Sequence, residues 1–381
     1  MCGLRKPIAV TPSIVGTGTL AKAVTVMKAL VLCAGRGTRL RPLTHTRAKA
    51  ALPVAGRPVL GHILTYLKAQ GFFDVGIVIS PEQGELRRLG AAAEDQRLTF
   101  IRQRWPRGIA HAVQAAADWL GGDPFLLYLG DNLTDEDLGP AKARFEADGP
   151  DALIAVRPVE DPRRFGVAEV ADGRVNRVVE KPTAPASNLA IAGIYFFRST
   201  IHEAIRALTP SARGEFEITD AIQALVQAGA AVLAHRMTGW WQDMGSPEGM
   251  LAANAHLLDL LVPAISPDAT VFSSPIQGRV VIGDGAVLER VRLRGPLLIG
   301  PGCHIQDAYI GPYTSIGEGA VIAGASVENS ILLPGCRLSG PTFHLEDCLL
   351  GRGAAVEVKP GRTTTLLVGD DGRLQIPVDW G

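Results

Sequence analysis

Hydrophobic residues follow two different patterns along this chain, and the pattern changes between residues 258 and 271. From residue 27 to about residue 258, short apolar runs alternate with stretches in which apolar residues recur at helical spacing. Such alternation predicts an α/β sheet with helices packed on its faces. After a first strand at 28–33, the expected strands are 75–80, 98–102, 125–129, 152–156, 175–180 and 191–197, and the expected helices are 61–70, 110–120, 201–207 and 220–228.

The second pattern begins at Val271, where helical spacing disappears and an aliphatic residue followed by glycine, as in Ile282-Gly283 and Ile316-Gly317, recurs at multiples of about six residues. Units too short to bury a core alone must share one with their neighbours, so we expect the stacked coils of a parallel β-helix. A β-sandwich with glycine-rich turns is the alternative, but the hairpin turns that it needs are missing over most of this stretch. The tail around Asp371-Gly372 does look like a hairpin.

These patterns divide the chain into four expected segments. Residues 1–26 carry no continuous apolar region of a signal peptide, so we expect an upstream start or a disordered arm without chemistry. An α/β domain is expected at 27–258, a linker at 259–270, and a β-helix domain at 271–381 that ends in the hairpin.

Charge and cysteine content limit the classes of partner. The 381 residues include 38 Lys and Arg and 38 Asp and Glu, so the formal net charge of zero gives no general attraction to nucleic acid or to a membrane surface. None of the five cysteines forms a C-x-x-C pair or a zinc-ligand pattern with the histidines. No apolar run is long enough to span a bilayer. We therefore expect a soluble protein of the reducing cytoplasm that acts on small molecules.

The segment after the first strand combines glycines with cations. Gly35 and Gly37 lack a Cβ, so backbone N–H groups near them can approach phosphate oxygens, and Arg39 and Lys49 add positive charge beside this turn. The loop is neither a Walker A motif nor a dinucleotide-binding fingerprint. An ordinary strand-to-helix turn would leave the two cations unexplained. We therefore predict a cradle for a triphosphate.

Two aspartates are candidate metal ligands. Asp131 follows the apolar strand 125–129 and Gly130, and ligands of such sheets bind beyond the carboxyl ends of the strands. Asp243 lies within the sequence Trp-Gln-Asp-Met-Gly at 241–245. Two carboxylates, completed by phosphate oxygens and water, are a usual way to hold Mg²⁺ on a nucleotide. Each aspartate alone could instead be a turn or cap residue, and for Asp243 alone that reading is favoured.

These segments together resemble the nucleotidyltransferases that activate sugar 1-phosphates, whose pattern is G-x-G-T-R-L followed by a lysine and L-P-V. The resemblance covers about residues 27–381 and is closest to the longer glucose-1-phosphate thymidylyltransferases of deoxysugar pathways. It implies a Rossmann-like (GT-A-like) mixed sheet followed by a left-handed, hexapeptide-repeat β-helix. Two departures are Ala34, where many members carry another glycine, and Ala50, where the short thymidylyltransferases carry glutamine after the lysine.

The resemblance also implies roles for matching residues. It makes Asp131 and Asp243 the ligands of Mg²⁺, and it makes Arg39, Lys49 and Lys181 the catalytic cations. The implied nucleotide-binding residues are Gly35, Gly37, Thr38, Arg39, Gln103 and Gly108. The implied sugar-phosphate-binding residues are Gly166, Glu180, Lys181, Asn188, Gly193 and Arg213.

The implied reaction is Mg²⁺-dependent transfer of a nucleotidyl group from dTTP to glucose 1-phosphate, which gives dTDP-glucose and pyrophosphate for deoxysugar biosynthesis. Because Ala50 replaces the glutamine, a UTP- or GTP-using enzyme is the alternative. A non-catalytic regulatory or assembly subunit should have lost cations or metal aspartates, yet all are present. An acyltransferase based on His304 or His344 lacks the expected asparagine and glutamate context. We therefore expect the β-helix to serve assembly or allostery, and we expect a homo-oligomer.

Overall fold

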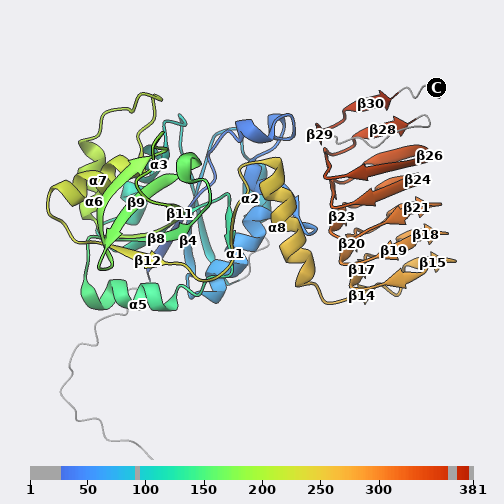
Figure 1. Ribbon diagram of the computed structural model, residues 1–381, viewed down its shortest axis with the longest axis horizontal. Helices are drawn as coiled ribbons and strands as arrows, with labels where there is room; N and C mark the ends of the chain where they lie inside the picture. The colour runs from blue at the N-terminus through green and yellow to red at the C-terminus, as the bar shows by residue number, and fades with distance from the viewer. Residues whose placement is uncertain (1–26, 91–94, 359–366, 377–381) are drawn as a thin grey trace, which may run out of the picture.

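The computed structural model describes residues 27–90, 95–358 and 367–376. Its first domain is built on a sheet in the order β5-β4-β1-β6-β11-β8-β12-β10-β9 (Figure 1). Strands β5, β4, β1 and β6 are parallel, whereas β11 runs antiparallel to both β6 and β8, so the sheet is mixed as expected. The strands are β1 (Lys28–Leu32), β4 (Asp74–Ile79), β5 (Arg97–Arg102), β6 (Phe125–Leu129), β8 (Ala152–Pro158), β9 (Gly166–Ala171), β10 (Arg174–Glu180), β11 (Leu189–Phe197) and β12 (Val232–Arg236).

Two small antiparallel ribbons and several helices complete this domain. The ribbons pair β2 (Pro53–Val54) with β3 (Arg57–Pro58), and β7 (Asn132–Thr134) with β13 (Trp241–Asp243). The expected helix 110–120 is divided at Ala116 into α3 and α4. The α-helices are α1 (Val59–Ala69), α2 (Glu85–Gly90), α3 (Ile109–Ala115), α4 (Ala117–Leu120), α5 (Gly139–Asp148), α6 (Thr200–Arg206), α7 (Ile218–Gln227) and α8 (Pro247–Asp259), and the 3₁₀ helices are η1 (Thr38–Leu40), η2 (Leu43–His45), η3 (Lys49–Ala51) and η4 (Pro162–Arg164).

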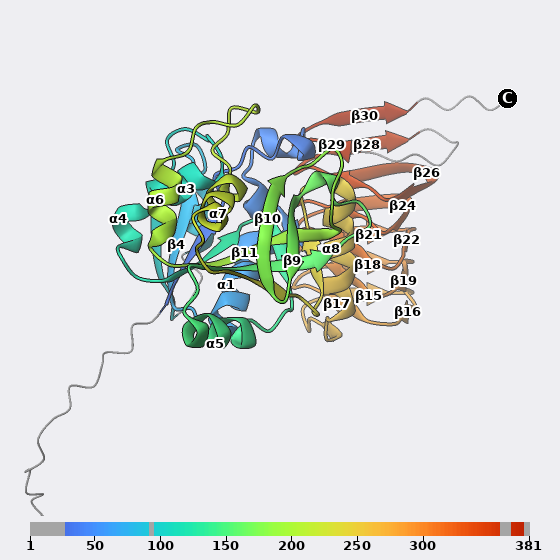
Figure 2. The same ribbon diagram turned by 60° about the vertical axis from the view of Figure 1, so that its left-hand side comes forward.

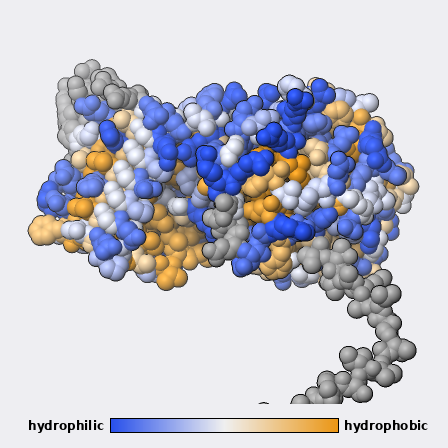
Figure 3. Space-filling view, turned by 180° about the vertical axis from the view of Figure 1, so that it is seen from behind, coloured by the Kyte–Doolittle hydropathy of each residue, from blue (hydrophilic) through white to orange (hydrophobic). Residues whose placement is uncertain are grey.

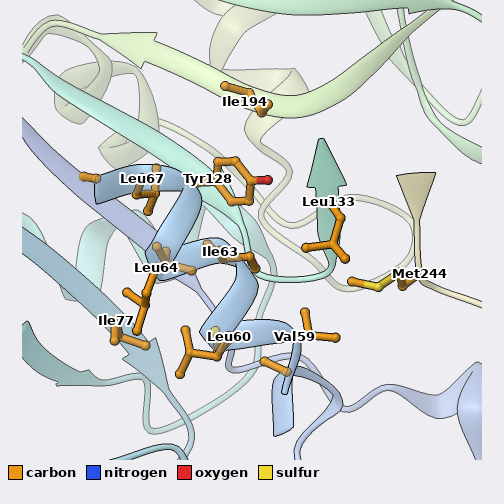
Figure 4. Packing of buried hydrophobic residues seen from close by; sticks show 14 of the residues in the cluster. Val59, Leu60, Ile63, Leu64, Leu67, Ile77, Tyr128, Leu133, Ile194 and Met244 are labelled. Atoms are coloured by element: carbon orange, nitrogen blue, oxygen red, sulfur yellow. The ribbon is translucent and has the colours of Figure 1, made fainter. Parts of the chain in front are cut away.

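The large sheet has a hydrophobic core on each face. Helices α3, α6 and α7 contribute to one core, and α1, α5 and α8 contribute to the other. Figure 4 shows the second core, where Tyr128 of β6 and Ile77 of β4 lie near α1, with Leu133 and Met244 alongside. This packing fixes the segments on either side of Asp131 and Asp243. The buried residues of α1 recur at helical spacing: Val59, Leu60, Ile63, Leu64 and Leu67.

The second domain is a parallel β-helix, as expected. Each coil pairs in parallel with the next, so Val280 lies beside Leu297 and Leu297 beside Thr314. Aliphatic and cysteine side chains from successive coils form its core. Its strands are β14 (Ala264–Ile265), β15 (Thr270–Phe272), β16 (Ile276–Gln277), β17 (Val280–Ile282), β18 (Val287–Glu289), β19 (Arg292–Arg294), β20 (Leu297–Ile299), β21 (His304–Gln306), β22 (Tyr309–Ile310), β23 (Thr314–Ile316), β24 (Val321–Glu328), β25 (Ile331–Leu332), β26 (Arg337–Glu346), β27 (Leu349–Leu350), β28 (Ala355–Val358), β29 (Leu367–Val368) and β30 (Arg373–Ile376).

Two expectations about the second domain are wrong. The described tail is not a hairpin, because β29 pairs in parallel with β27 and β30 pairs in parallel with β28, so these strands extend the β-helix and Asp371-Gly372 forms a corner of the coil. The stretch 259–270 is not purely linker, because β14 lies within it and pairs with β17. Both misreadings arise because a strand of two to four residues carries too little pattern to be recognised without its neighbouring coil.

Helix α8 joins the two domains (Figures 1 and 2). The fully buried Asn254 on this helix accepts hydrogen bonds at Oδ1 from Ala55 N (2.8 Å) and Ser315 Oγ (2.6 Å), and its Nδ2 donates to Tyr313 O (2.8 Å). Ile331 of the β-helix also packs into the core of the first domain. The β-helix is therefore docked through specific polar and apolar contacts.

The surface is mixed rather than uniformly polar. On the face seen in Figure 3, hydrophobic residues gather on the β-helix side of the domain junction and in a separate area of the first domain. Exposed large hydrophobic residues of the junction and first coil include Leu260, Val262, Ile265 and Phe272. Across the described ranges, no helix combines the length and apolar character required to cross a membrane.

Candidate active site

A cleft of about 610 Å³ opens at the carboxyl ends of β1 and β6. The glycine loop after β1, the Gly130-Asp131 step after β6 and the loop after β5 all contribute to its wall. Lys49 and Gly245 line it as well, although they come from distant parts of the sequence. The cleft therefore occupies the position at which ligands of α/β sheets bind.

The glycine loop has the backbone form that the sequence suggested. Gly37 adopts φ +60°, and a Cβ at this position would lie 2.9 Å from Cγ2 of Thr44. The Thr44 hydroxyl donates to Gly37 O at 2.7 Å and so fixes the turn. No atom lies within 4 Å of the Cβ position of Gly35, which leaves open space beside the chain. Thr38 and Arg39 are exposed at the cleft, where they can reach a ligand.

The two candidate metal aspartates are brought together by the β7–β13 ribbon. In this ribbon Asp243 lies opposite Asn132, and Met244 N donates to Asp131 O at 2.9 Å. Asn132 Nδ2 donates to Asp131 Oδ1 at 3.1 Å, while Gly245 N donates to Asp243 Oδ1 at 2.8 Å. One carboxylate oxygen of each aspartate is thus oriented by the protein itself.

Both aspartates are surrounded by the predicted cations. Lys49 Nζ donates to Asp131 Oδ2 at 2.6 Å, and Arg39 Nη2 lies 4.0 Å from Asp243 Oδ2. Burial acts to raise the pKa of Asp131, but the Lys49 ammonium outweighs it and holds this pKa below the ordinary value. Burial and the nearby Asp131 carboxylate raise the pKa of Asp243. Two such carboxylates suit a hard divalent cation that relieves their repulsion.

The protein supplies few metal ligands beyond this pair. Within the described parts of the chain, no three His, Cys, Asp or Glu residues are grouped so that they could hold a metal ion. A cation bound by Asp131 and Asp243 would therefore take its remaining oxygen ligands from substrate phosphates and water, which is typical of Mg²⁺ on nucleotides.

The loop after β5 forms another wall of the cleft. Gln103 is buried, and its Nε2 lies 3.2 Å from Gly108 O and 2.9 Å from His111 Nδ1. Gly108 adopts φ +102°, and a Cβ there would lie 2.5 Å from Phe216 O, so this position requires glycine. Ala50 is buried and lines the cleft nearby.

The residues predicted for the sugar phosphate gather around Glu180. Arg213 Nη2 donates to Glu180 Oε1 at 3.1 Å, and Lys181 Nζ lies 3.2 Å from the same oxygen. A Cβ on Gly166 would lie 3.2 Å from Glu180 Oε2. Gly193 borders the metal aspartates instead, because a Cβ there would lie 2.6 Å from the side-chain nitrogen of Asn132. Arg213 also lines the cleft, so these residues continue it towards the end of β10.

Five of the predicted sugar-phosphate residues are not among those that line the described cleft: Gly166, Glu180, Lys181, Gly193 and Asn188. Asn188 is exposed, and its carbonyl accepts a hydrogen bond from Val159 N at 3.0 Å. Conversely, sequence reasoning missed Glu217 and Gly245. Glu217 holds Arg213 at 2.7 Å, and its signal in the sequence was an acidic residue four positions after that arginine. Gly245 lines the cleft two residues after Asp243.

A glycine loop, paired carboxylates and a rim of cations on a Rossmann-like sheet define an enzyme that transfers phosphate-bearing groups. Comparison with known families defines a narrower class of enzyme. Residues 28–259 match the nucleotidyl transferase family, and the chain belongs to this family. The chain is 42% identical over 358 residues to a glucose-1-phosphate thymidylyltransferase of Streptomyces griseus, covering 92% of this chain and 99% of that protein. Nucleotidyltransferases of this family generally use a divalent metal.

Two further proteins, one compared by sequence and one by structure, are similar to this chain. The bifunctional protein GlmU of Methanocaldococcus jannaschii is 34% identical over 85% of this chain and 79% of that protein. The structure of the UDP-glucose pyrophosphorylase from Acinetobacter baumanii superposes with a TM-score of 0.54 at 27% identity, covering 61% of this chain and 93% of that one. The first of these matches extends beyond the catalytic domain of this chain, and the second corresponds in extent to that domain.

Proposed function

We propose that this protein transfers a thymidylyl group from dTTP to glucose 1-phosphate, releasing pyrophosphate and forming dTDP-glucose. The observation that carries the proposal is the convergence of Arg39, Lys49 and Asp131 on one cleft at the ends of β1 and β6, with the Asp243 carboxylate 4.0 Å from Arg39 beside it. The Streptomyces relative supplies the substrate pair, since it matches nearly its whole length to this chain.

The reaction needs alignment and charge neutralisation more than proton transfer. The second pKa of a phosphomonoester is about 6, so glucose 1-phosphate is mostly dianionic at neutral pH and requires no general base. Mg²⁺ held by Asp131 and Asp243 would neutralise phosphate charge and bring the two anionic substrates together. The side chains around it then have to orient the attacking oxygen in line with the bond to pyrophosphate.

Each cation has a proposed partner in that arrangement. Arg39 and the backbone N–H groups near Gly35 and Gly37 would bind the β- and γ-phosphates, which leave as pyrophosphate. Lys49 would neutralise charge developing around the α-phosphate. Lys181 and Arg213 would bind the sugar phosphate, and Glu180 between them would accept hydrogen bonds from sugar hydroxyls.

Base selection is proposed to rest on Gln103 and Gly108. The Gln103 amide nitrogen is engaged by Gly108 O and His111, so its carbonyl oxygen is the group left to accept a hydrogen bond from a pyrimidine. Thymine and uracil differ by one methyl group, which a fitted pocket discriminates by about 10- to 200-fold. We propose that the enzyme prefers dTTP. Because Ala50 supplies no amide beside Lys49, we expect this preference to be incomplete, with measurable use of UTP.

The decisive experiment is pyrophosphate release with glucose 1-phosphate and each of dTTP, UTP, GTP, CTP and ATP in turn. The proposal predicts the highest kcat/KM with dTTP and loss of activity in chelator. Preference for GTP or ATP would contradict the assigned role of Gln103. No turnover with any nucleotide, while nucleotide still binds, would favour a regulatory subunit.

The setting of the enzyme is also a proposal. Cys33, Cys303 and Cys336 are buried free thiols in the described part of the chain, which supports a reducing cytoplasm. Stacked coils present flat faces, so we propose a homo-oligomer assembled through the β-helix. Light scattering on the full chain measures the mass that tests it.

A further inference from the structure

The guanidinium of Arg213 is held through two of its nitrogens, Nε and Nη2, and is open at the third. Its Nε and Nη2 donate to Glu217 Oε1 at 3.2 and 2.7 Å, and Nη2 also donates to Glu180 Oε1 at 3.1 Å. Among the described residues, Nη1 donates to no group. An arginine whose Nε and Nη2 are fixed by carboxylates presents its Nη1 group in a set orientation, which suits an oxygen of a phosphate ligand.

Glu217 is more deeply buried than the other carboxylates near Arg213, Glu180 and Glu215. Its side chain is only 4% exposed, and Oε1 also accepts a hydrogen bond from Ser211 Oγ at 2.9 Å. Glu215 is 47% exposed and 3.8 Å from Arg213. Glu217 stands at the start of α7 but its side chain makes no capping hydrogen bond there. Its contacts are therefore directed at the 211–213 turn and not at the helix.

The backbone around Glu217 is anchored to the wall of the nucleotide cleft. Phe216 N donates to Arg107 O at 2.7 Å, and Ala110 N donates to Phe216 O at 3.0 Å. The segment that carries Arg213 and Glu217 thus shares hydrogen bonds with the loop that carries Gly108. Because this base is fixed, a carboxylate at Glu217 can set the direction of the Arg213 guanidinium.

We propose that Glu217 is a positioning residue that orients Arg213 for the phosphate of the hexose 1-phosphate. The inference rests on the proposed function, in which Arg213 binds that phosphate. Without Glu217 the arginine keeps its charge but gains rotamer freedom, and it can pair with Glu180 or Glu215 in other orientations. The sugar phosphate must then order it on binding. Loss of Glu217 should therefore weaken the binding of the sugar phosphate, because Arg213 contacts the phosphate both before and during the reaction.

The test is a double-mutant cycle on Arg213→Ala and Glu217→Ala, read as KM for glucose 1-phosphate and for nucleotide separately. We expect each single variant to raise the sugar-phosphate KM about tenfold, with kcat and nucleotide KM nearly unchanged. The double variant should be no worse than Arg213→Ala alone. Glu217→Gln retains an acceptor oxygen and should recover most of the loss.

Controls separate positioning from folding. Asp307→Ala breaks a comparable arginine–carboxylate pair with Arg290 on the β-helix, where the two bonds measure 2.6 and 2.9 Å, and should change neither KM. Thermal unfolding of every variant shows whether the fold is kept, and if Glu217→Ala fails to fold, Glu217→Leu, which is closer in volume and has no acceptor oxygen, takes its place in the cycle.

The possible failures are distinct. If Arg213→Ala raises the sugar-phosphate KM and Glu217→Ala does not, or if the two effects multiply in the double variant, Glu217 does not act through Arg213 and this inference is wrong. If Arg213→Ala itself leaves the sugar-phosphate KM unchanged, the assignment of Arg213 in the proposed function is wrong instead.

Discussion

Lys49 donates a hydrogen bond to a carboxylate oxygen that a metal ion would also bind, so removal of this lysine should change the affinity for metal by an amount that can be estimated. Its ammonium donates to Asp131 Oδ2 at 2.6 Å, and the lysine side chain is 13% exposed. A divalent cation at that oxygen has to displace this hydrogen bond. Hydrogen bonds to charged groups contribute about 1.5–3 kcal/mol net, and about 1.4 kcal/mol is a factor of ten in affinity. Lys49→Met should therefore bind metal about 10- to 150-fold more tightly in the absence of nucleotide.

The assay is titration of metal-free, nucleotide-free protein with Mn²⁺, followed by the electron paramagnetic resonance signal of the free ion. Lys68→Met is the matched control, because it removes a lysine paired at 3.0 Å with Asp95 on the surface. Unchanged or weaker Mn²⁺ binding by Lys49→Met would refute the reasoning. The same variant should lower the melting temperature of the metal-free protein, since Asp131 and Asp243 lose a counter-ion, and Mn²⁺ should restore it. Turnover should fall despite the tighter metal binding.

Three further predictions concern the framework of the site. Gly108→Ala should destabilise the protein by about 1–3 kcal/mol and raise the nucleotide KM, because the backbone conformation at this position favours glycine and Phe216 O blocks a Cβ. Denaturant unfolding measures the loss of stability, and steady-state kinetics measure the nucleotide KM. Asn254→Ala should cost at least about 2 kcal/mol in urea unfolding, since buried partners in both domains lose their hydrogen bonds. Burial acts to raise the pKa of Glu136, but hydrogen bonds from Gly239 and its neighbours outweigh burial and hold this pKa below the ordinary value. The ionised Glu136 side chain therefore stabilises the fold at neutral pH, and this stabilisation is lost as pH falls from about 5. Glu136→Gln should flatten that part of the stability profile; an unchanged profile would exclude Glu136 as its source.

The sequence predicted best those elements whose own hydrophobic pattern reveals them. Strands β1, β4 and β6 are buried in a parallel arrangement, so they read as apolar runs, and the glycine loop follows β1 directly. The direct contact between Lys49 and Asp131 was not predictable. Lys49 and Asp131 are 82 positions apart, and nothing local indicates that this cation meets this carboxylate. Helix α8 escaped prediction because it is covered by a domain on each side and its apolar residues do not form one stripe.

The position of α8 links the β-helix to the cleft. The helix begins at Pro247, directly after the segment that carries Asp243 and Gly245, and Ser246 caps it by accepting from Gly249 N. Gly249 lies against the backbone of Asp243, since a Cβ there would fall 2.3 Å from Asp243 O. Further along the same helix, Asn254 bonds to the backbone and side chains of β-helix coils. The segment that presents one carboxylate of the candidate metal pair is therefore connected to the second domain through one continuous helix.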